Sequence, residues 1–168
     1  LKIADALRDD TKIVHAQTGR GGATKEILHA AISVADPRQR WVMSRQPAIN
    51  PALALAEVVW VITGRNDKAF LANWSGSWAN TVGPGPTIHD AYGHRLRSHL
   101  KFDQLTRAYQ ALSNNPGSRQ VVLQIWDSSI DLPADDGQPA NQDIPCNVMS
   151  LLKVRGGKLD WLQIIRSN

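Results

Sequence analysis

The chain has 168 residues, of which 42% are hydrophobic and 20% charged, and its net charge is +4. This length suggests one domain that buries a real core, and the composition is ordinary for a soluble globular protein. The basic residues form no block typical of a nucleic-acid arm or a membrane patch, and no apolar run reaches transmembrane length. We therefore expect neither nucleic acid nor a membrane as a partner.

Cysteine and histidine usage narrows the functions further. The five histidines are scattered, and no cysteine pair has zinc-ligand spacing, so no metal site is predicted. The single cysteine, Cys146, rules out an intramolecular disulfide and fits a reducing compartment, which predicts a cytoplasmic protein. The sequence begins at Leu1 without a methionine and stops at Asn168 within a predicted strand. We therefore expect residues 1–168 to form a single domain that is incomplete at its C-terminus.

The N-terminal part of the chain carries weak local signals. Residues 1–7 could form a short helix, because their apolar side chains share one helical face. The glycine-rich segment 17–22 has N–H groups that could meet an anion, although a plain turn would have the same composition. Periodicity does not decide between strand and helix over 25–34, and a short strand is predicted over 41–43.

The clearest predicted helix begins after Asn50. Asn50 is an N-cap residue, Pro51 suits the first helical position, and Gly64 ends the helix. The helix body is apolar on every face except for Glu57, which predicts that the helix is buried. A buried carboxylate is unfavourable unless it is paired or functional, so Glu57 is either an ion-pair partner of an upstream arginine or a functional group.

Further elements are predicted in the central part of the chain. A short helix is capped by Asp67, an amphipathic helix begins at Asp103, and a strand is predicted over 121–126. The amphipathic helix is expected to turn its large apolar residues inward, together with the one just before it, namely Phe102, Leu105, Tyr109 and Leu112. Residues 127–142 are polar and rich in proline and glycine, which predicts a surface loop.

A β-hairpin is predicted near the C-terminal end. Gly156 and Gly157 separate two apolar, β-branched runs, and a glycine pair there favours a two-residue turn in which both residues have positive φ. Counting outward from this turn places Lys153 opposite Asp160. That pair of opposite charges supports the register.

The same register brings polar residues together at the open end of the hairpin. It places Asn147 opposite Arg166 and Cys146 opposite Ser167, unless a β-bulge shifts the pairing by one residue. A thiolate is a nucleophile, and a neighbouring guanidinium lowers the pKa of a thiol or binds an anionic group of a substrate. A buried structural cysteine beside a surface arginine is the alternative.

These residues resemble the active-site segment of the thymidylate synthases. Pro145-Cys146 is followed, one hairpin later, by Arg166-Ser167 at the family's spacing. Four further segments resemble the family in the same order, namely Ala56–Trp60, Tyr92-Gly93, Asp103–Leu105 and Ser118-Arg119. The resemblance implies an α+β fold, in which a mixed sheet is covered by helices on one face and packs in a homodimer through the other. It also favours a strand over 25–34.

The resemblance implies an activity and a cofactor. The activity would be one-carbon transfer to C5 of a pyrimidine nucleotide monophosphate, as in the methylation of dUMP. The donor of carbon and hydride would be 5,10-methylenetetrahydrofolate. Trp74 and Trp78 would pack against the folate and the nucleotide, and stacking on a flat ligand suits two tryptophans in such a loop. As a plain alternative, they anchor the loop.

By the same resemblance, Cys146 would add to C6 of the pyrimidine, which makes C5 nucleophilic. Glu57 and Tyr92 would manage protons. Arg166 and Ser167 would hold the nucleotide phosphate.

Several positions depart from the family pattern. Gln17 stands where the family has a phosphate-binding arginine, and Arg20 could substitute for it from within the loop. Arg119 would reach the partner subunit's phosphate, but its neighbour is Gln120 instead of a second arginine. Asn147 follows the nucleophile where the family has histidine, and asparagine can form hydrogen bonds but cannot titrate.

These departures leave two alternatives open. Asn147 is compatible with a 5-hydroxymethylase of dCMP, CMP or dUMP, which adds water instead of hydride. Three weakened contacts, at Gln17, Gln120 and Asn147, are compatible with an inactive nucleotide-binding homologue. The segment that would choose the base lies beyond Asn168.

Overall fold

The chain forms two compact units, residues 1–46 and residues 47–167. The computed structural model describes residues 15–19, 22–27, 29–38, 46, 48–76, 82–141 and 143–166. The single domain over 1–168 stays a prediction. Among the described residues, no helix has both the length and the apolar character needed to cross a membrane.

The N-terminal unit contains an antiparallel hairpin. Strand β1 (His15–Gly19) pairs with β2 (Gly22–Glu26), and Gly19 lies opposite Gly22. The glycine-rich segment therefore joins two paired strands. The helix expected over 1–7 and the strand expected over 41–43 lie outside the described residues.

The strand expected over 25–34 is wrong beyond its first two residues. Strand β2 ends at Glu26, and residues 30–34 form neither strand nor helix. Ile32 and Val34 are exposed. Apolar character alone does not make a strand, because a strand also needs a neighbouring backbone to pair with.

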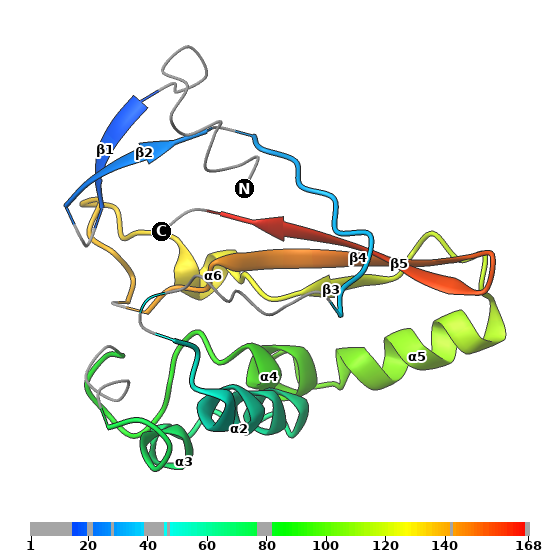
Figure 1. The fold of residues 1–168 in the computed structure, drawn as a ribbon, viewed down its shortest axis with the longest axis horizontal. Coiled ribbons are helices and arrows are strands. Elements are labelled where there is room, and N and C mark those ends of the chain that lie inside the picture. The colour runs from blue at the N-terminus through cyan, green and yellow to red at the C-terminus, as the bar shows by residue number, and fades with distance from the viewer. Residues whose placement is uncertain are drawn as a thin grey trace. The chain divides into compact units, whose positions relative to one another are not determined.

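The larger unit combines short helices with a three-stranded sheet (Figure 1). In chain order, its elements are α2 (Pro51–Ile62), α3 (Lys68–Ala72), α4 (Tyr92–His94), the π-helical turn η2 (Arg95–His99), α5 (Gln104–Asn114), β3 (Val122–Gln124), α6 (Ser128–Asp131), β4 (Asn147–Arg155) and β5 (Lys158–Ile165). The strand order is β3-β4-β5, and both pairings are antiparallel. Helices α4 and α5 lie on one side of this sheet (Figure 1), which confirms the α+β class.

Two groups of buried side chains hold this unit together. One lies between α5, η2 and the sheet and consists of Leu96, Ala108, Leu112, Val121, Leu123, Ile125 and Leu152. The other joins α2, α3 and α4 and consists of Ala56, Trp60, Leu71, Ile88 and Ala91. Tyr92 packs against the first group and is also the first residue of α4, so both groups determine its position.

Helix α2 begins and ends as predicted. The Asn50 side chain accepts hydrogen bonds from Ala52 N and Leu53 N, at 3.1 and 3.2 Å, and Pro51 is the first helical residue. Gly64 follows the helix with a φ of 72°. A left-handed residue at this position is a common way to end a helix.

The predicted burial of α2 is wrong. Only Ala56 and Trp60 of this helix are buried, and Glu57 is exposed. The exposed side chains include Leu55, Val58, Val59 and Ile62. The helix turns one narrow stripe toward α3 and α4, and no described element covers the opposite face. Apolar composition therefore reports which surface could be buried, not which surface is.

Helix α5 packs through a stripe that matches the predicted one only in part, because Leu112 is buried and Leu105 packs against the core, but Phe102 and Tyr109 are exposed. Its buried residues are Gln104, Ala108 and Leu112, whereas Tyr109 is 75% exposed. Gln104 points inward because its side-chain amide bonds to both backbone groups of Gln124, at 2.9 and 2.8 Å. A side-chain amide whose hydrogen bonds are made can be buried. The polar character of Gln104 therefore did not indicate which face of α5 points inward.

Candidate active site

Cys146 lies at the open end of the β4–β5 hairpin, immediately before β4. Its side chain is partly buried, and the preceding Pro145 is buried. From Lys153↔Asp160 to Arg155↔Lys158 the register is the predicted one. A bulge between Asn147 and Met149 then shifts the pairing by one residue.

The bulge corrects two predicted partners. Asn147 pairs with Ile165, not with Arg166. The backbone N–H of Arg166 donates to the carbonyl of Cys146 at 2.9 Å, so Cys146 faces Arg166 and not Ser167. Ser167 itself lies outside the described residues. The bulge thus changes which side chains lie beside the thiol.

The Arg166 side chain holds the loop that carries the thiol. Its Nε donates to the carbonyl of Pro145 at 3.0 Å, and its Nη2 donates to the carbonyl of Ile144 at 3.1 Å. The guanidinium carbon lies 4.8 Å from the centre of the Trp126 ring, a cation–π contact. Sequence reasoning missed Trp126. It could have been identified as the aromatic residue that ends the strand predicted over 121–126.

The Tyr92 hydroxyl lies beside Cys146. Burial raises the pKa of Tyr92 to about 12, and the charges of Asp90 and of an ionised Cys146 act in the same direction. Hydrogen bonds with the backbone of Cys146 and Asn147 act in the opposite direction. The phenol therefore stays protonated at neutral pH and can donate a hydrogen bond next to the thiol. The structure thus brings together Tyr92 and Cys146, two of the predicted site residues.

Two carboxyl groups that sequence reasoning missed lie next to these residues. Burial, followed by the charge and hydrogen bond of Asp143 and by the charge of Glu57, raises the pKa of Asp90 to about 7, against the opposing charge of Arg95. Asp90 lies two residues before Tyr92, and Asp143 lies three residues before Cys146. The short separation of each acidic residue from Tyr92 or Cys146 in the sequence could have identified both of them.

Glu57 belongs to the same neighbourhood through its charge. It lies on the exposed side of α2 and acts electrostatically on Asp90. Within the described part of the chain, no salt bridge joins Glu57 to an arginine, so the ion-pair alternative has no support there. The charge of Glu57 thus acts on Asp90, and the charges of Asp90 and Cys146 both act on Tyr92.

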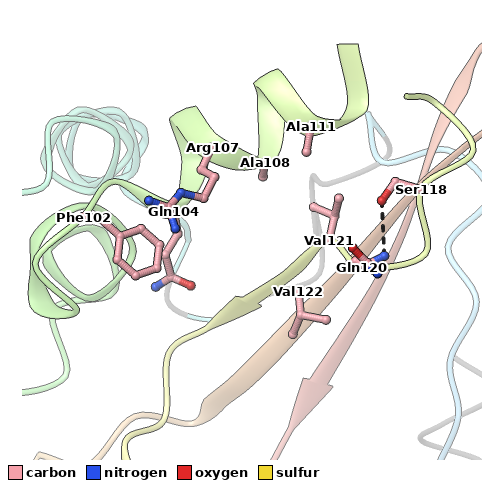
Figure 2. Close-up of a pocket in the computed structure, with 9 residues that line it drawn as sticks. All are labelled: Phe102, Gln104, Arg107, Ala108, Ala111, Ser118, Gln120, Val121 and Val122. Carbon is pink, nitrogen blue, oxygen red and sulfur yellow. Dashed lines mark hydrogen bonds between the residues drawn. The ribbon is translucent and has the colours of Figure 1, made fainter. Parts of the chain in front are cut away.

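Two other predicted site residues, Arg119 and Gln120, lie next to β3 and not beside Cys146. Arg119 is exposed just before β3, and Gln120 lines a pocket of about 260 Å³ between α5 and β3. Figure 2 shows Gln120 and Ser118 facing this pocket from the strand side and Arg107 and Ala108 from α5. The pocket includes neither Cys146 nor Tyr92, so Gln120 does not line a common pocket with them.

The remaining predicted ligand contacts are only partly described. Trp74 follows α3 and is 47% exposed, whereas Trp78 lies outside the described residues. Gln17 lies in β1 opposite Thr24 in the N-terminal unit, and Arg20 lies outside the described residues. Among the described residues, no three His, Cys, Asp or Glu side chains are grouped to hold a metal ion.

Comparison with known proteins identifies the family. The family model for thymidylate synthase matches residues 11–168. The chain belongs to the thymidylate synthase family. A solved family member, thermostable thymidylate synthase A from Bacillus subtilis, is 30% identical, with a TM-score of 0.52 over 70% of this chain and 42% of that one. This likeness supports the fold of the family for this chain.

Relatives carry two different activity names. A deoxyuridylate hydroxymethyltransferase of Pseudomonas phage M6 is 33% identical over 79% of this chain and 36% of that protein. One of Bacillus phage SP01 is 31% identical over 89% of this chain and 40% of that protein. A putative thymidylate synthase of Methanothermobacter marburgensis is 26% identical over the whole chain and 69% of that protein. The chain thus spans about two fifths of the length of the two phage relatives.

Proposed function

We propose that this thymidylate synthase family chain carries the nucleophile of a folate-dependent enzyme, which transfers one carbon to C5 of a pyrimidine nucleotide monophosphate. One observation carries the proposal. The thiol of Cys146 lies in a loop that Arg166 holds by its carbonyls, with a protonated Tyr92 hydroxyl beside it. A structural cysteine needs neither neighbour.

The chemistry assigns a role to each group. The Cys146 thiolate adds to C6 of the pyrimidine, and the electron pair moves toward the C4 carbonyl, which leaves C5 nucleophilic. After the new carbon–carbon bond forms at C5, the C5 proton must leave, and elimination of Cys146 restores the ring. Tyr92, a donor at neutral pH, orients the group that takes this proton, and Glu57 accepts protons from the same network. Arg166 binds the nucleotide phosphate.

The exposed Trp74 ring suits the folate partner. A half-exposed indole beyond α3 offers a flat apolar surface for a pterin ring, and Trp78 follows four residues later. Bound 5,10-methylenetetrahydrofolate supplies the carbon and, for a methyl product, the hydride. Trp74 and Trp78 hold it, and the chain's own residues carry the nucleophile and the protons.

Methylation of dUMP is the first candidate reaction, because the family model describes thymidylate synthase. Hydroxymethylation is the second, and two observations favour it. Asn147 follows the nucleophile, and the two phage relatives are named deoxyuridylate hydroxymethyltransferase. In that reaction, water takes the place of the hydride. Both reactions share the same covalent step, so they are separated by product and not by nucleophile.

We further propose that the enzyme is a cytoplasmic homodimer. The face of the sheet opposite α5 is formed by Val122 of β3, Leu151 of β4, and Leu162 and Ile164 of β5. Val122, Leu162 and Ile164 are between 42% and 58% exposed. An apolar face of this kind suits burial against a second copy.

Exposed Arg119 would reach the partner's nucleotide phosphate. An Arg119→Ala chain mixed with a Cys146→Ala chain should then regain activity in hybrid dimers.

The decisive test uses the full-length protein and a 5-fluoro-dUMP probe. Fluorine replaces the proton that must leave C5, so the nucleotide stays joined to Cys146 and to the folate carbon. Intact-mass spectrometry should show a covalent complex of protein, nucleotide and folate, and Cys146→Ala should show none. With dUMP itself, a methyl product with dihydrofolate indicates methylation, and a hydroxymethyl product with tetrahydrofolate indicates hydroxymethylation.

The same experiment tests the non-enzyme alternative. Binding of dUMP and dCMP without any adduct or product would favour an inactive nucleotide-binding homologue. That outcome would overturn the proposed function.

A further inference from the structure

Arg166 contacts three successive carbonyl groups of the loop that carries the thiol. Its backbone N–H donates to the carbonyl of Cys146 at 2.9 Å, its Nε to that of Pro145 at 3.0 Å, and its Nη2 to that of Ile144 at 3.1 Å. Two of these three bonds come from the guanidinium group. The orientation of this group therefore determines where the loop, and with it the thiol, lies.

Hydrogen bonds alone do not fix the orientation of a guanidinium group. Nε and Nη2 lie on one edge of the planar group, so their two bonds set the direction of that edge. The plane can still turn about the edge, because a carbonyl oxygen accepts hydrogen bonds over a broad range of directions. A contact through the flat face stops this rotation. The Trp126 ring makes such a contact, since the guanidinium carbon of Arg166 lies 4.8 Å from the ring centre.

The backbone of Trp126 is held independently of Arg166. The N–H groups of Ile125 and Trp126 both donate to the carbonyl of Val148, each at 3.0 Å. Val148 lies at the bulge of β4, two residues after Cys146. The indole is therefore attached to the part of the sheet that lies beside the thiol.

The residue after Trp126 fixes the chain from the other side. The backbone N–H of Asp127 donates to Oδ2 of Asp131 at 2.8 Å, and Asp131 forms the buried ion pair with Arg95. The Asp127 carboxylate also caps α6. Trp126 thus lies between two anchored stretches of backbone, so its position does not depend on the guanidinium that its ring contacts.

The surroundings of the ring are not those of a core residue. Trp126 is partly exposed and belongs to neither of the two groups of buried side chains. In the part of the chain that the structure describes, the indole N–H groups of Trp60 and Trp161 have hydrogen-bond acceptors, whereas that of Trp126 has none. The flat face of the Trp126 ring is thus the part that makes a specific contact, and this contact is with Arg166.

We propose that Trp126 is a positioning residue, whose ring fixes the plane of the Arg166 guanidinium and thereby the loop of Cys146. This inference rests on the proposed function, in which Arg166 binds the nucleotide phosphate and Cys146 adds to the base. Trp126 acts through Arg166 and not on the substrate. Loss of the ring should therefore affect the nucleotide and leave the folate unaffected.

The variant Trp126→Leu keeps an apolar side chain but removes the ring face. A guanidinium that turns about its edge meets the phosphate in several orientations, so the dissociation constant for dUMP should rise about 3- to 30-fold, the range of a cation–π contact. KM for 5,10-methylenetetrahydrofolate should stay within about twofold. The dUMP concentration that half-protects Cys146 of the full-length protein from iodoacetamide measures nucleotide binding without turnover. An unchanged half-protection concentration would overturn the positioning role.

Two further variants control this measurement. Trp126→Phe keeps a flat aromatic face, and its half-protection concentration should stay within about threefold of the wild-type value. Trp161→Leu removes a tryptophan from β5 that is 54% exposed and lies opposite Leu152, and it should shift the value by less than about twofold. Equal shifts for Trp161→Leu and Trp126→Leu would show a general loss of packing and would overturn the positioning role.

Fluorinated tryptophans at position 126 test the contact without removing the ring. Each fluorine atom draws negative potential away from the ring face and weakens its attraction for a cation, while it adds little volume. With one, two and three fluorine atoms, the half-protection concentration should rise in steps. This series keeps the inference testable if Trp126→Leu folds poorly. A constant value across the series would overturn the role of the ring face.

The outcomes also separate this inference from the proposed function. A wild type that forms the 5-fluoro-dUMP adduct, together with a fluorinated series that binds dUMP equally well, would overturn the positioning role alone. A wild type that binds dUMP but forms neither adduct nor product would overturn the proposed function, and the half-protection values would still decide whether Trp126 positions Arg166. A wild type that does not bind dUMP would overturn both.

Discussion

The segment 143–166 carries the predicted nucleophile Cys146, and helix α2 carries the predicted proton acceptor Glu57. In the segment, the register predicted near the turn is present, and only a bulge next to the thiol changes it. In α2, the predicted ends are present, but the predicted burial is not. Cys146 is partly buried among named partners, whereas Glu57 is exposed.

The difference follows from the range of the interactions that fix each region. A two-residue turn, a cross-strand charge pair and β-branched side chains act over a few residues, so the sequence of the hairpin contains them. Helix caps act over the same range, and they too were predictable. Burial of a helix face depends on elements far away in the chain, and the composition of the helix does not contain them.

The largest expected effect comes from the thiol of the segment. Cys146→Ala removes the nucleophile, so kcat should fall by at least about 10⁴-fold, while nucleotide binding stays within about threefold. Single-turnover assays and nucleotide titration of the full-length protein measure both quantities. Cys146→Ser, which keeps the shape but not the reactivity, is the matched control and should be nearly as inactive. Substantial turnover in either variant would remove Cys146 from the mechanism.

A smaller effect is expected from the carboxylate of α2. Glu57→Gln keeps the size of the side chain but cannot accept a proton, so kcat should fall by about 10²–10⁴-fold. Because Glu57 is exposed, the free energy of unfolding should change by no more than about 0.5 kcal/mol. Glu57→Asp retains an acid and should recover part of the activity. A stability loss without a kinetic effect would make Glu57 a structural residue.

The same contrast shows how far sequence reasoning reached in the site. Cys146, Tyr92 and Arg166 were each chosen from motifs. The hairpin brings Cys146 and Arg166 together locally, whereas core packing places Tyr92 beside them. Asp90, Asp143 and Trp126 were missed, because their importance arises from contacts between distant segments. The buried ion pair of Asp131 with Arg95, at 2.7 Å, was missed for the same reason. The surface-loop prediction for 127–142 is wrong over α6 (Ser128–Asp131), which is helical and ends in this buried residue.

Packing between α2 and α4 offers a third test. A Cβ atom at Gly93 would overlap the backbone carbonyl of Val61, and backbone cannot move aside as a flexible side chain can. Gly93→Ala should therefore lower the free energy of unfolding by about 3 kcal/mol, at the upper end of overpacking effects. Gly76→Ala is the matched control, because nothing lies within 4 Å of its Cβ position. Equal urea midpoints for the two variants would show that α2 and α4 approach each other less closely.

The smallest expected effect comes from the hairpin turn, where conformation rather than contact decides. Gly156 and Gly157 have φ values of 55° and 72°, and nothing lies within 4 Å of either Cβ position. Gly157→Ala should lower the free energy of unfolding by about 1 kcal/mol, because left-handed backbone is unfavourable for alanine. Gly156→Asn should lower it by only a few tenths of a kcal/mol, since asparagine followed by glycine suits this turn. Urea midpoints at pH 7 measure both values. If Gly156→Asn were as unfavourable as Gly157→Ala, the turn would not be of the two-residue type that sets the register, and the pairing of Lys153 with Asp160 would need another cause.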